Sequence, residues 1–227
     1  RLSLVGSEMC IRDSPHGNLE TELFGRADKD RITLSGKINC PKLWNGVKSP
    51  ALYRAEITLF CNGEPVDSIE QEFGIRSYHI DADNGFFLNG KPYPLHGVNY
   101  HQDSYESGWA MTGAQRERDY RIIRDMGCTA VRMAHYQHCD HEYSLCDRLG
   151  LCVWTEIGII NKMSADDSDA HVLSDGFGDN AKQQLRELIR QNYNHPSVIV
   201  WGLSNELYQM TNEIFGLYSE LYEIACE

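Results

Sequence analysis

The stretch VIVWGLSNE, residues 198–206, decides how the second half of this chain folds. Its first four residues are apolar, which is typical of a strand that is buried on both faces. The stretch then ends in the polar residues Ser204, Asn205 and Glu206. A buried strand that carries an amide and a carboxylate at its carboxyl end needs an explanation, and the segments around it provide one.

The segments on either side of this strand alternate between strand and helix patterns from Leu95 onward. Strand patterns cover 95–100, 129–136 and 151–158, and helical periodicity covers 113–127, 140–150, about 179–193 and 211–227. Four successive strand–helix units imply a parallel sheet. A doubly wound sheet is one solution, but no GxGxxG motif or P-loop follows any of the strands. The other solution is the first half of a (β/α)8 barrel.

Polar residues gather at the carboxyl ends of all four predicted strands. They are Asn99 and His101, Arg132 and His135, Glu156, and finally Asn205 and Glu206. The active residues of a (β/α)8 barrel lie at these ends, so the pattern favours the barrel. The strand at 198–206 is then buried along its length, and its polar end faces the active site.

Residues 15–75 have a β pattern instead. The runs 31–39 and 51–60 are rich in β-branched and aromatic residues, and CNGEP at 61–65 predicts a turn between two strands. Three or four strands are too few for a complete sandwich, so we expect the C-terminal part of one over residues 15–80. A turn-rich segment at 81–94 predicts a linking hairpin at the start of a barrel unit, 81–227.

The N-terminal stretch LVGSEMCIRDS, residues 4–14, has neither a helical nor a strand period. All eleven of its residues resemble the translation of a transposase adaptor used in DNA sequencing. Residues 1–14 are therefore interpreted as a cloning or assembly artefact, and the alternative is an ordinary disordered tail. Either interpretation predicts that they make no defined packing with the rest of the chain.

Composition excludes several classes of partner. The net charge of −12 argues against binding to nucleic acid or to an anionic membrane, because both require a basic patch. No apolar run approaches the roughly 20 residues that a membrane span needs. The eight cysteines form no CxxC pair, and several fall in predicted strands or helices. We interpret them as free thiols, which fits a cytoplasmic, reducing compartment.

The strand ends also carry a family signature. NYNHPSVIVWGLSNE (192–206) closely resembles the acid/base motif of glycoside hydrolase family 2, which holds β-galactosidases, β-glucuronidases and β-mannosidases. Three further blocks of that family are similar to 97–103, 129–138 and 145–157. The stretch 73–99 resembles the family's junction between an immunoglobulin-like domain and a TIM barrel. The resemblance covers about 30–227 and implies an immunoglobulin-like β-sandwich before the barrel.

The resemblance implies roles for individual residues. Glu206 resembles the general acid/base, and Asn205 resembles the amide that hydrogen-bonds the sugar 2-hydroxyl. Arg132 resembles the arginine placed beside the nucleophile, and His135 resembles a histidine that contacts the sugar. His101 and Glu156 fall in family blocks and are further candidates for substrate binding, although Glu156 could equally support the site by hydrogen bonding, and His101 is as readily a structural residue.

No cofactor or metal is expected. Some β-galactosidases of the family have a Glu-x-His pair that helps to hold magnesium, and GIINKMS (158–164) lacks it. Tyr100 stands where the family commonly has an arginine. A zinc site is an alternative use of the cluster His135, His138, Cys139 and His141, but the family motif already accounts for His135. Trp154 and Trp201 are expected in the core, although an aromatic residue near a strand end can also form the floor of a sugar site.

Two classes of function follow. The first is a fragment of a retaining exo-β-glycosidase, with β-galactosidase as the first choice and β-glucuronidase as the second. The other is a non-catalytic carbohydrate-binding remnant. Retaining hydrolysis uses two carboxyl groups, and the resemblance implies that the nucleophile lies on a seventh strand, beyond residue 227. We therefore expect the chain alone to be inactive and poorly stable, because half a barrel exposes two sheet edges. For the full-length protein, a homo-oligomer is one alternative that the sequence leaves open.

Overall fold

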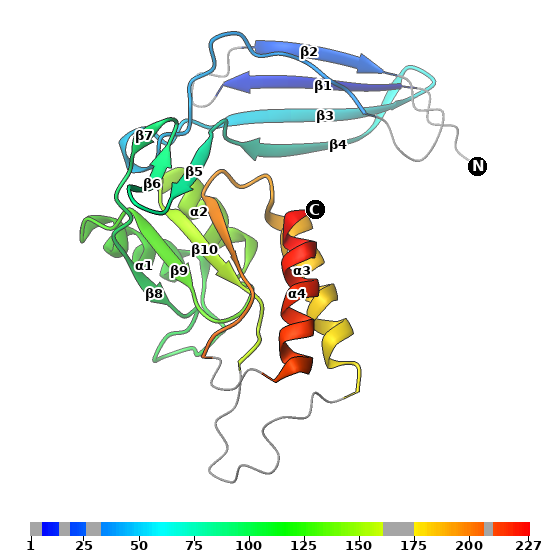
Figure 1. Cartoon of the computed structure of the whole chain (residues 1–227). Helices are drawn as coiled ribbons and strands as arrows, with labels where there is room; N and C mark the ends of the chain where they lie inside the picture. The colour runs from blue at the N-terminus through cyan, green and yellow to red at the C-terminus, as the bar shows by residue number, and fades with distance from the viewer. Residues whose placement is uncertain (1–5, 14–18, 26–32, 161–174, 207–210) are drawn as a thin grey trace.

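A computed structural model describes residues 6–13, 19–25, 33–160, 175–206 and 211–227 of the chain (Figure 1). Within these ranges the strands form an extended antiparallel sheet, a small antiparallel sheet and a parallel sheet. Helices accompany the parallel sheet, and none of the described helices is long and apolar enough to cross a membrane.

The extended antiparallel sheet contains β1 (Gly6–Asp13), β2 (Leu19–Gly25), β3 (Tyr53–Cys61) and β4 (Glu64–Phe73), in the order β2-β1-β3-β4. β3 and β4 are joined by a two-residue turn in which Asn62 and Gly63 have φ angles of +53° and +87°. Asn-Gly suits this geometry because both residues tolerate positive φ, and the turn twists in the same sense as the strands. The turn predicted at 61–65 is confirmed.

Two expectations for this region are wrong. Gly6–Asp13 is not a separate tail but a strand that pairs with β2 on one side and β3 on the other. Backbone groups make this pairing, and the strand covers an edge of β3 that would otherwise be open, so no side-chain period is needed to specify it. The strand predicted at 31–39 has no regular secondary structure over residues 33–39.

The small antiparallel sheet confirms the predicted linking hairpin. It contains β5 (Tyr78–Asp81), β6 (Gly85–Leu88) and β7 (Lys91–Pro92). An apolar cluster joins it to the short helix η1 (Gly46–Lys48) and to the amino ends of the barrel strands; its buried members are Trp44, Leu52, Phe86, Leu88, Tyr93, Cys152 and Ile199. Burial there raises the pKa of the Cys152 thiol to about 12, which keeps it protonated.

The parallel sheet contains β8 (Gly97–Tyr100), β9 (Ala130–Met133), β10 (Cys152–Glu156) and β11 (Val198–Gly202), in the order β11-β10-β9-β8. The helices α1 (Gly113–Asp125), α2 (Asp140–Leu149), α3 (Phe177–Asn192) and α4 (Asn212–Cys226) follow these strands in turn. Every neighbouring pair in this sheet is parallel, so the predicted first half of a (β/α)8 barrel is confirmed.

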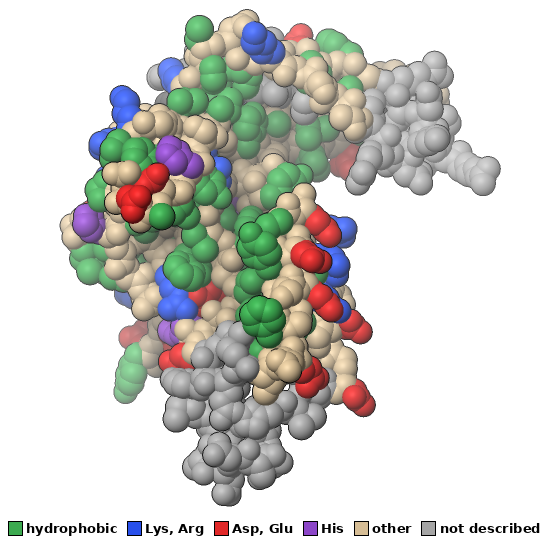
Figure 2. All heavy atoms as spheres, viewed as in Figure 1, with side chains coloured by type: hydrophobic (Ala, Val, Ile, Leu, Met, Phe, Trp, Pro, Cys, Tyr) green, Lys and Arg blue, Asp and Glu red, His purple; other side chains and the backbone are tan. Residues whose placement is uncertain are grey.

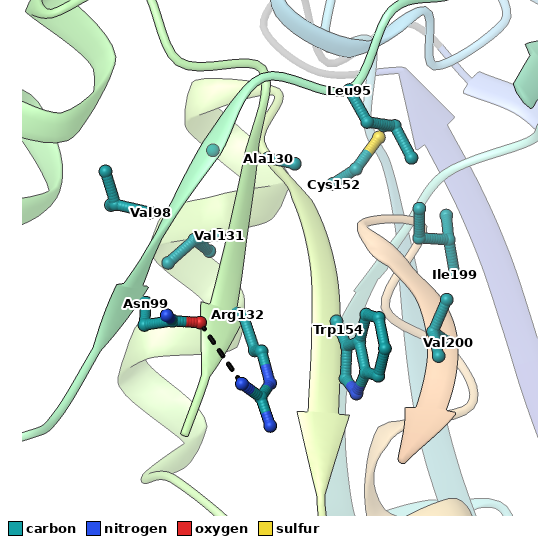
Figure 3. Close-up of a pocket in the computed structure, with 11 residues that line it drawn as sticks. Leu95, Val98, Asn99, Ala130, Val131, Arg132, Cys152, Trp154, Ile199 and Val200 are labelled. Carbon is teal, nitrogen blue, oxygen red and sulfur yellow. Dashed lines mark hydrogen bonds between the residues drawn. The ribbon is translucent and has the colours of Figure 1, made fainter. Parts of the chain in front are cut away.

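The two faces of the parallel sheet differ in what covers them. Val131, Met133 and Val153 lie on the outer face and pack against Tyr120 of α1 and Tyr143 of α2. The inner face is open and borders a groove of about 380 Å³ (Figure 3). Apolar side chains gather over this face and along α4 (Figure 2). The faces alternate with residue number, because successive side chains of a strand point in opposite directions.

A buried carboxylate fixes the start of β11. Asp147 of α2 accepts a hydrogen bond from the backbone N–H of Ser197 at 3.1 Å, and its other oxygen lies 2.6 Å from Nδ1 of His195. The Arg76 guanidinium donates to the carbonyls of Pro196 (2.8 Å) and Val198 (2.6 Å). These contacts hold β11 in place beside β10 and thereby position the residues at its far end.

Two glycines with the same backbone conformation allow a matched test of this packing. Gly127 and Gly150 follow α1 and α2 with φ angles of +87° and +77°. A Cβ at Gly127 would meet nothing within 4 Å, whereas one at Gly150 would meet the Gly46 carbonyl and lie 2.6 Å from the Val47 nitrogen. Gly127→Ala should cost about 1–2 kcal/mol through positive φ alone. We expect Gly150→Ala to lower the urea midpoint of unfolding clearly more than Gly127→Ala does. Equal midpoints for the two variants would contradict this account.

The stabilisation contributed by His195 should depend on pH. Burial opposes its charge, but the hydrogen bond and charge of Asp147, with a smaller contribution from Asp140, raise its pKa above the ordinary value of 6.5. A group whose pKa is higher in the folded state than in the unfolded state stabilises the fold. This stabilisation is fully present at pH values below the unfolded-state pKa, and it is lost as the pH rises through the folded-state pKa. The decrease in melting temperature caused by His195→Asn should therefore be larger near pH 5.5 than near pH 8.5. A loss that is independent of pH would show that the imidazole is not charged in the folded state.

Candidate active site

The carboxyl ends of the four parallel strands bring one polar cluster together. Asn99 of β8 lies opposite Arg132 of β9, and Arg132 lies opposite Trp154 of β10. Glu156 ends β10, opposite Gly202 of β11. These positions share the inner face of the sheet. The side chains of Asn99, Arg132 and Trp154 border the groove (Figure 3).

Glu156 is the buried centre of the cluster. Its side chain has no exposed surface, and its two oxygens have different partners. Oε1 accepts a hydrogen bond from Nε of Arg132, and Oε2 lies 2.9 Å from Nδ1 of His135. A carboxylate without such partners would be costly to bury, so Arg132 and His135 are what allow Glu156 to occupy this position.

Arg132 connects this carboxylate to the neighbouring strands. Its Nη2 donates to Oδ1 of Asn205 at 2.9 Å, and its Nη1 donates to Oδ1 of Asn99 at 3.4 Å (Figure 3). The guanidinium also lies over the Trp154 ring, 5.4 Å from its centre. Since the amide oxygen of Asn205 is bound to Arg132, the orientation of the amide is fixed and its NH₂ group faces away from Arg132. Among the described residues no acceptor engages this NH₂ group, so it is available to donate to a hydroxyl oxygen.

Glu206 directly follows Asn205. The backbone N–H of Asn205 donates to the carbonyl of Ile159 at 2.9 Å, which ties this turn to the end of β10. Glu206 is exposed and has a φ of +50°, a left-handed conformation that costs a non-glycine residue about 1–2 kcal/mol. Among the described residues no hydrogen bond or ion pair engages its carboxylate, so the group is free to meet a ligand. Strained residues of this kind are concentrated at functional sites.

The predicted site residues therefore fall into three groups. Arg132, His135, Glu156 and Asn205 form one connected cluster. His101 borders it, with its ring 5.3 Å from that of His135, and its Nδ1 lies 3.2 Å from the Tyr136 hydroxyl. Glu206 lies next to the cluster because it directly follows Asn205 in the chain.

Tyr136, beside His101, was not considered in the sequence reasoning, and Trp154 was expected in the core with the floor of a sugar site only as its alternative. Trp154 is 44% exposed and borders the groove, so the expectation of a core position is wrong. Its position on β10 could have shown this, because Trp154 and Glu156 are two residues apart and share one face. Trp201 is partly buried against the apolar clusters on the outer face, as expected.

Two of the residues considered as a zinc cluster, His138 and His135, have other partners. Nδ1 of buried His138 lies 2.6 Å from Oε2 of Glu142, and its Nε2 lies 3.1 Å from the carbonyl of Ala134. His135 is bound to Glu156. Across the described ranges, no group of three or more His, Cys, Asp or Glu side chains is arranged to hold a metal ion.

The different burial of the two ion-pair partners predicts an asymmetry. Glu156 is fully buried, whereas the Arg132 side chain is 25% exposed. Arg132→Ala leaves a buried carboxylate with His135 alone, and we expect a loss of about 3 kcal/mol. Glu156→Gln leaves a cation that water can reach, so it should cost less. In urea unfolding, the double variant Arg132→Ala/Glu156→Gln should be more stable than Arg132→Ala alone. If the double variant is the less stable of the two, the buried charge is not what makes the loss of Arg132 costly.

Known proteins are similar to both the β part and the barrel part of the chain. The model of "Glycosyl hydrolases family 2, TIM barrel domain" matches residues 80–221, and that of "Glycosyl hydrolases family 2" matches residues 13–76. A β-glucuronidase of Bacteroides fragilis is 44% identical over 188 residues, which are 83% of this chain and 27% of the relative. A β-galactosidase of Bacteroides ovatus is 30% identical over 86% of this chain and 23% of the relative.

A solved structure of a putative β-galactosidase from Bacteroides fragilis superimposes with a TM-score of 0.86 at 38% identity. The match covers 97% of this chain and 32% of that one. The chain thus spans about a quarter of the length of the curated relatives described above. The barrel match alone extends over more than half of the chain. The chain belongs to glycosyl hydrolase family 2.

Proposed function

We propose that this chain provides the acid/base side of the active site of a retaining exo-β-glycosidase. One observation carries the proposal. Asn205 is held by Arg132 at the carboxyl end of β11, and the next residue, Glu206, has an exposed carboxylate without a partner among the described residues. A general acid/base must be able to reach the glycosidic oxygen, and Glu206, which directly follows the cluster residue Asn205, has a carboxylate that is free to do so.

The other members of the cluster are proposed to bind and orient the sugar. The free NH₂ of Asn205 is the donor for a ring hydroxyl, and His135 and His101 border the same space. Arg132 and Glu156 hold Asn205 and His135 in place, because each is joined to one of them by a hydrogen bond. Removal of either partner should therefore weaken binding through misorientation rather than through a lost contact with the sugar.

Glu156 is an unsuitable nucleophile in this arrangement. Retaining hydrolysis requires a second carboxylate about 5–5.5 Å from the acid, with a lone pair directed at the anomeric carbon. Both oxygens of Glu156 are engaged, one by Arg132 and one by His135, and the side chain is fully buried. The proposed mechanism therefore assigns the nucleophile to a residue outside this cluster, as the family resemblance implies.

For the substrate we propose a terminal β-linked sugar, with a glucuronide ahead of a galactoside. The relative at 44% identity is named β-glucuronidase, and relatives at 30% include β-galactosidases. This reverses the order that the sequence motifs favoured. The charge of Arg132 is already matched by Glu156, so we do not assign it to a glucuronide carboxylate. Parallel assays with 4-nitrophenyl β-glucuronide and β-galactoside distinguish the two.

We also propose that the chain divides into a partial immunoglobulin-like unit at 15–80 and a barrel unit at 81–227. The separate family matches to 13–76 and 80–221 support this division. Strand β1 extends the first unit to residue 6.

The acid/base role of Glu206 is tested in a whole enzyme that carries these residues. Glu206→Gln removes the acid but retains the shape of the side chain. Glycosides with poor leaving groups should lose about 10²–10⁴-fold in kcat, because they depend on proton donation, whereas activated aryl glycosides should lose far less. Azide should restore turnover of the activated substrates. Equal losses on both substrate types without azide rescue would remove Glu206 from this role, and Glu213→Gln, an exposed glutamate in the first turn of α4, is the control.

A further inference from the structure

A run of aromatic rings leads away from the polar cluster along the loops that follow β8 and β9. The His101 ring lies 5.3 Å from that of His135 and 5.8 Å from that of Tyr136. The Trp109 ring in turn lies 4.7 Å from Tyr136, with an angle of 32° between the two planes. His101, Tyr136 and Trp109, here called the aromatic shelf, therefore form one connected run of rings that starts beside the candidate active site and ends at Trp109.

Neighbouring side chains and backbone hydrogen bonds hold the shelf in place. The ring of buried His138 stacks on Tyr136 at 5.2 Å, and His138 is itself fixed by Glu142 at 2.6 Å. The loop that carries Trp109 is closed by two backbone hydrogen bonds between Ser104 and Gly108, of 3.0 and 2.9 Å. A rigid surface loses little conformational entropy when a ligand binds to it.

The outer end of the shelf is open to solvent. Trp109 is 62% exposed, which is unusual for the largest apolar side chain. The Tyr136 hydroxyl and Nδ1 of His101 are within hydrogen-bonding distance of each other, at 3.2 Å. The Tyr136 hydroxyl and one ring nitrogen of His101 are thus engaged with each other, and the exposed outer end of the shelf is the Trp109 ring. Exposed aromatic surface beside a polar site is typical of a binding surface.

We infer that the aromatic shelf is the binding site for the aglycone, the leaving group of the β-glycoside, and that it selects aglycones with a flat apolar or aromatic face. This inference rests on the proposed function. The polar cluster offers hydrogen-bonding groups suited to the hydroxyls of the sugar. The shelf continues outward from His135 and ends in the exposed Trp109 ring, so a group attached to the anomeric oxygen that extends in this direction would stack on Trp109, which Tyr136 supports.

The kinetic test compares phenyl and methyl β-glycosides of the same sugar in a whole enzyme that carries these residues. Trp109→Ala should reduce the preference for phenyl over methyl, measured as the ratio of their kcat/KM values, by about three- to tenfold. Trp109→Phe should retain most of the preference. Tyr193→Ala, which removes another exposed aromatic side chain at the end of α3, should leave the ratio unchanged. An unchanged ratio in Trp109→Ala would overturn the inference.

A binding measurement separates this inference from the proposed function. The probe is the phenyl 1-thio-β-glycoside of each sugar, which is not hydrolysed, and its Kd is measured by calorimetry in the wild type and in the three variants. If wild-type enzyme cleaves no glycoside, the proposed function fails, but a Kd that Trp109→Ala raises three- to tenfold still supports the shelf. A Kd that Trp109→Ala and Tyr193→Ala change equally refutes the shelf even if the enzyme is active. Unchanged melting temperatures confirm that the variants are folded, as expected for exposed side chains.

Discussion

The geometry of the candidate site depends on one constraint, the burial of the Glu156 carboxylate. A charge without exposed surface requires partners, and the parallel register provides them by placing Arg132 on the adjacent strand and His135 just beyond it. Once Arg132 is committed to Glu156, its remaining nitrogens are directed at the amides of Asn99 and Asn205. One ion pair thus orients side chains from all four strands.

The two carboxylates differ in their environment. Glu156 and Glu206 lie at the ends of neighbouring strands, yet one is enclosed by two cationic or polar partners and the other is exposed on a left-handed turn. A carboxylate that is saturated with partners holds a structure together, whereas one without them remains available for proton transfer. The proposed roles therefore rest on burial and hydrogen bonding, because residue type alone does not distinguish the two carboxylates.

Much of this fold could be predicted from the sequence, because its helices and strands carry strong periods and its barrel strands end in polar residues. The positions that failed have specific physical causes. Strand Gly6–Asp13 is specified by backbone pairing with β2 and β3, which no side-chain pattern reveals. Residues 33–39 have strand-like composition but pair with no strand of the described sheets, and without such pairing a strand does not form. The hydrogen bond from Arg132 to Asn205 joins residues 73 positions apart, so only the folded sheet could show it.

The contacts at the amino end of the barrel cross the boundary between the two family matches. Arg76 belongs to the first match but bonds the carbonyls of Pro196 and Val198, and the Trp44 indole donates to the carbonyl of Asp147. A recombination breakpoint near residue 80 would exchange these side chains for those of another lineage while retaining the carbonyls that they bind. Gene shuffling within the family should therefore favour breakpoints before Trp44, so that the stretch from Trp44 to β11 is inherited as one block.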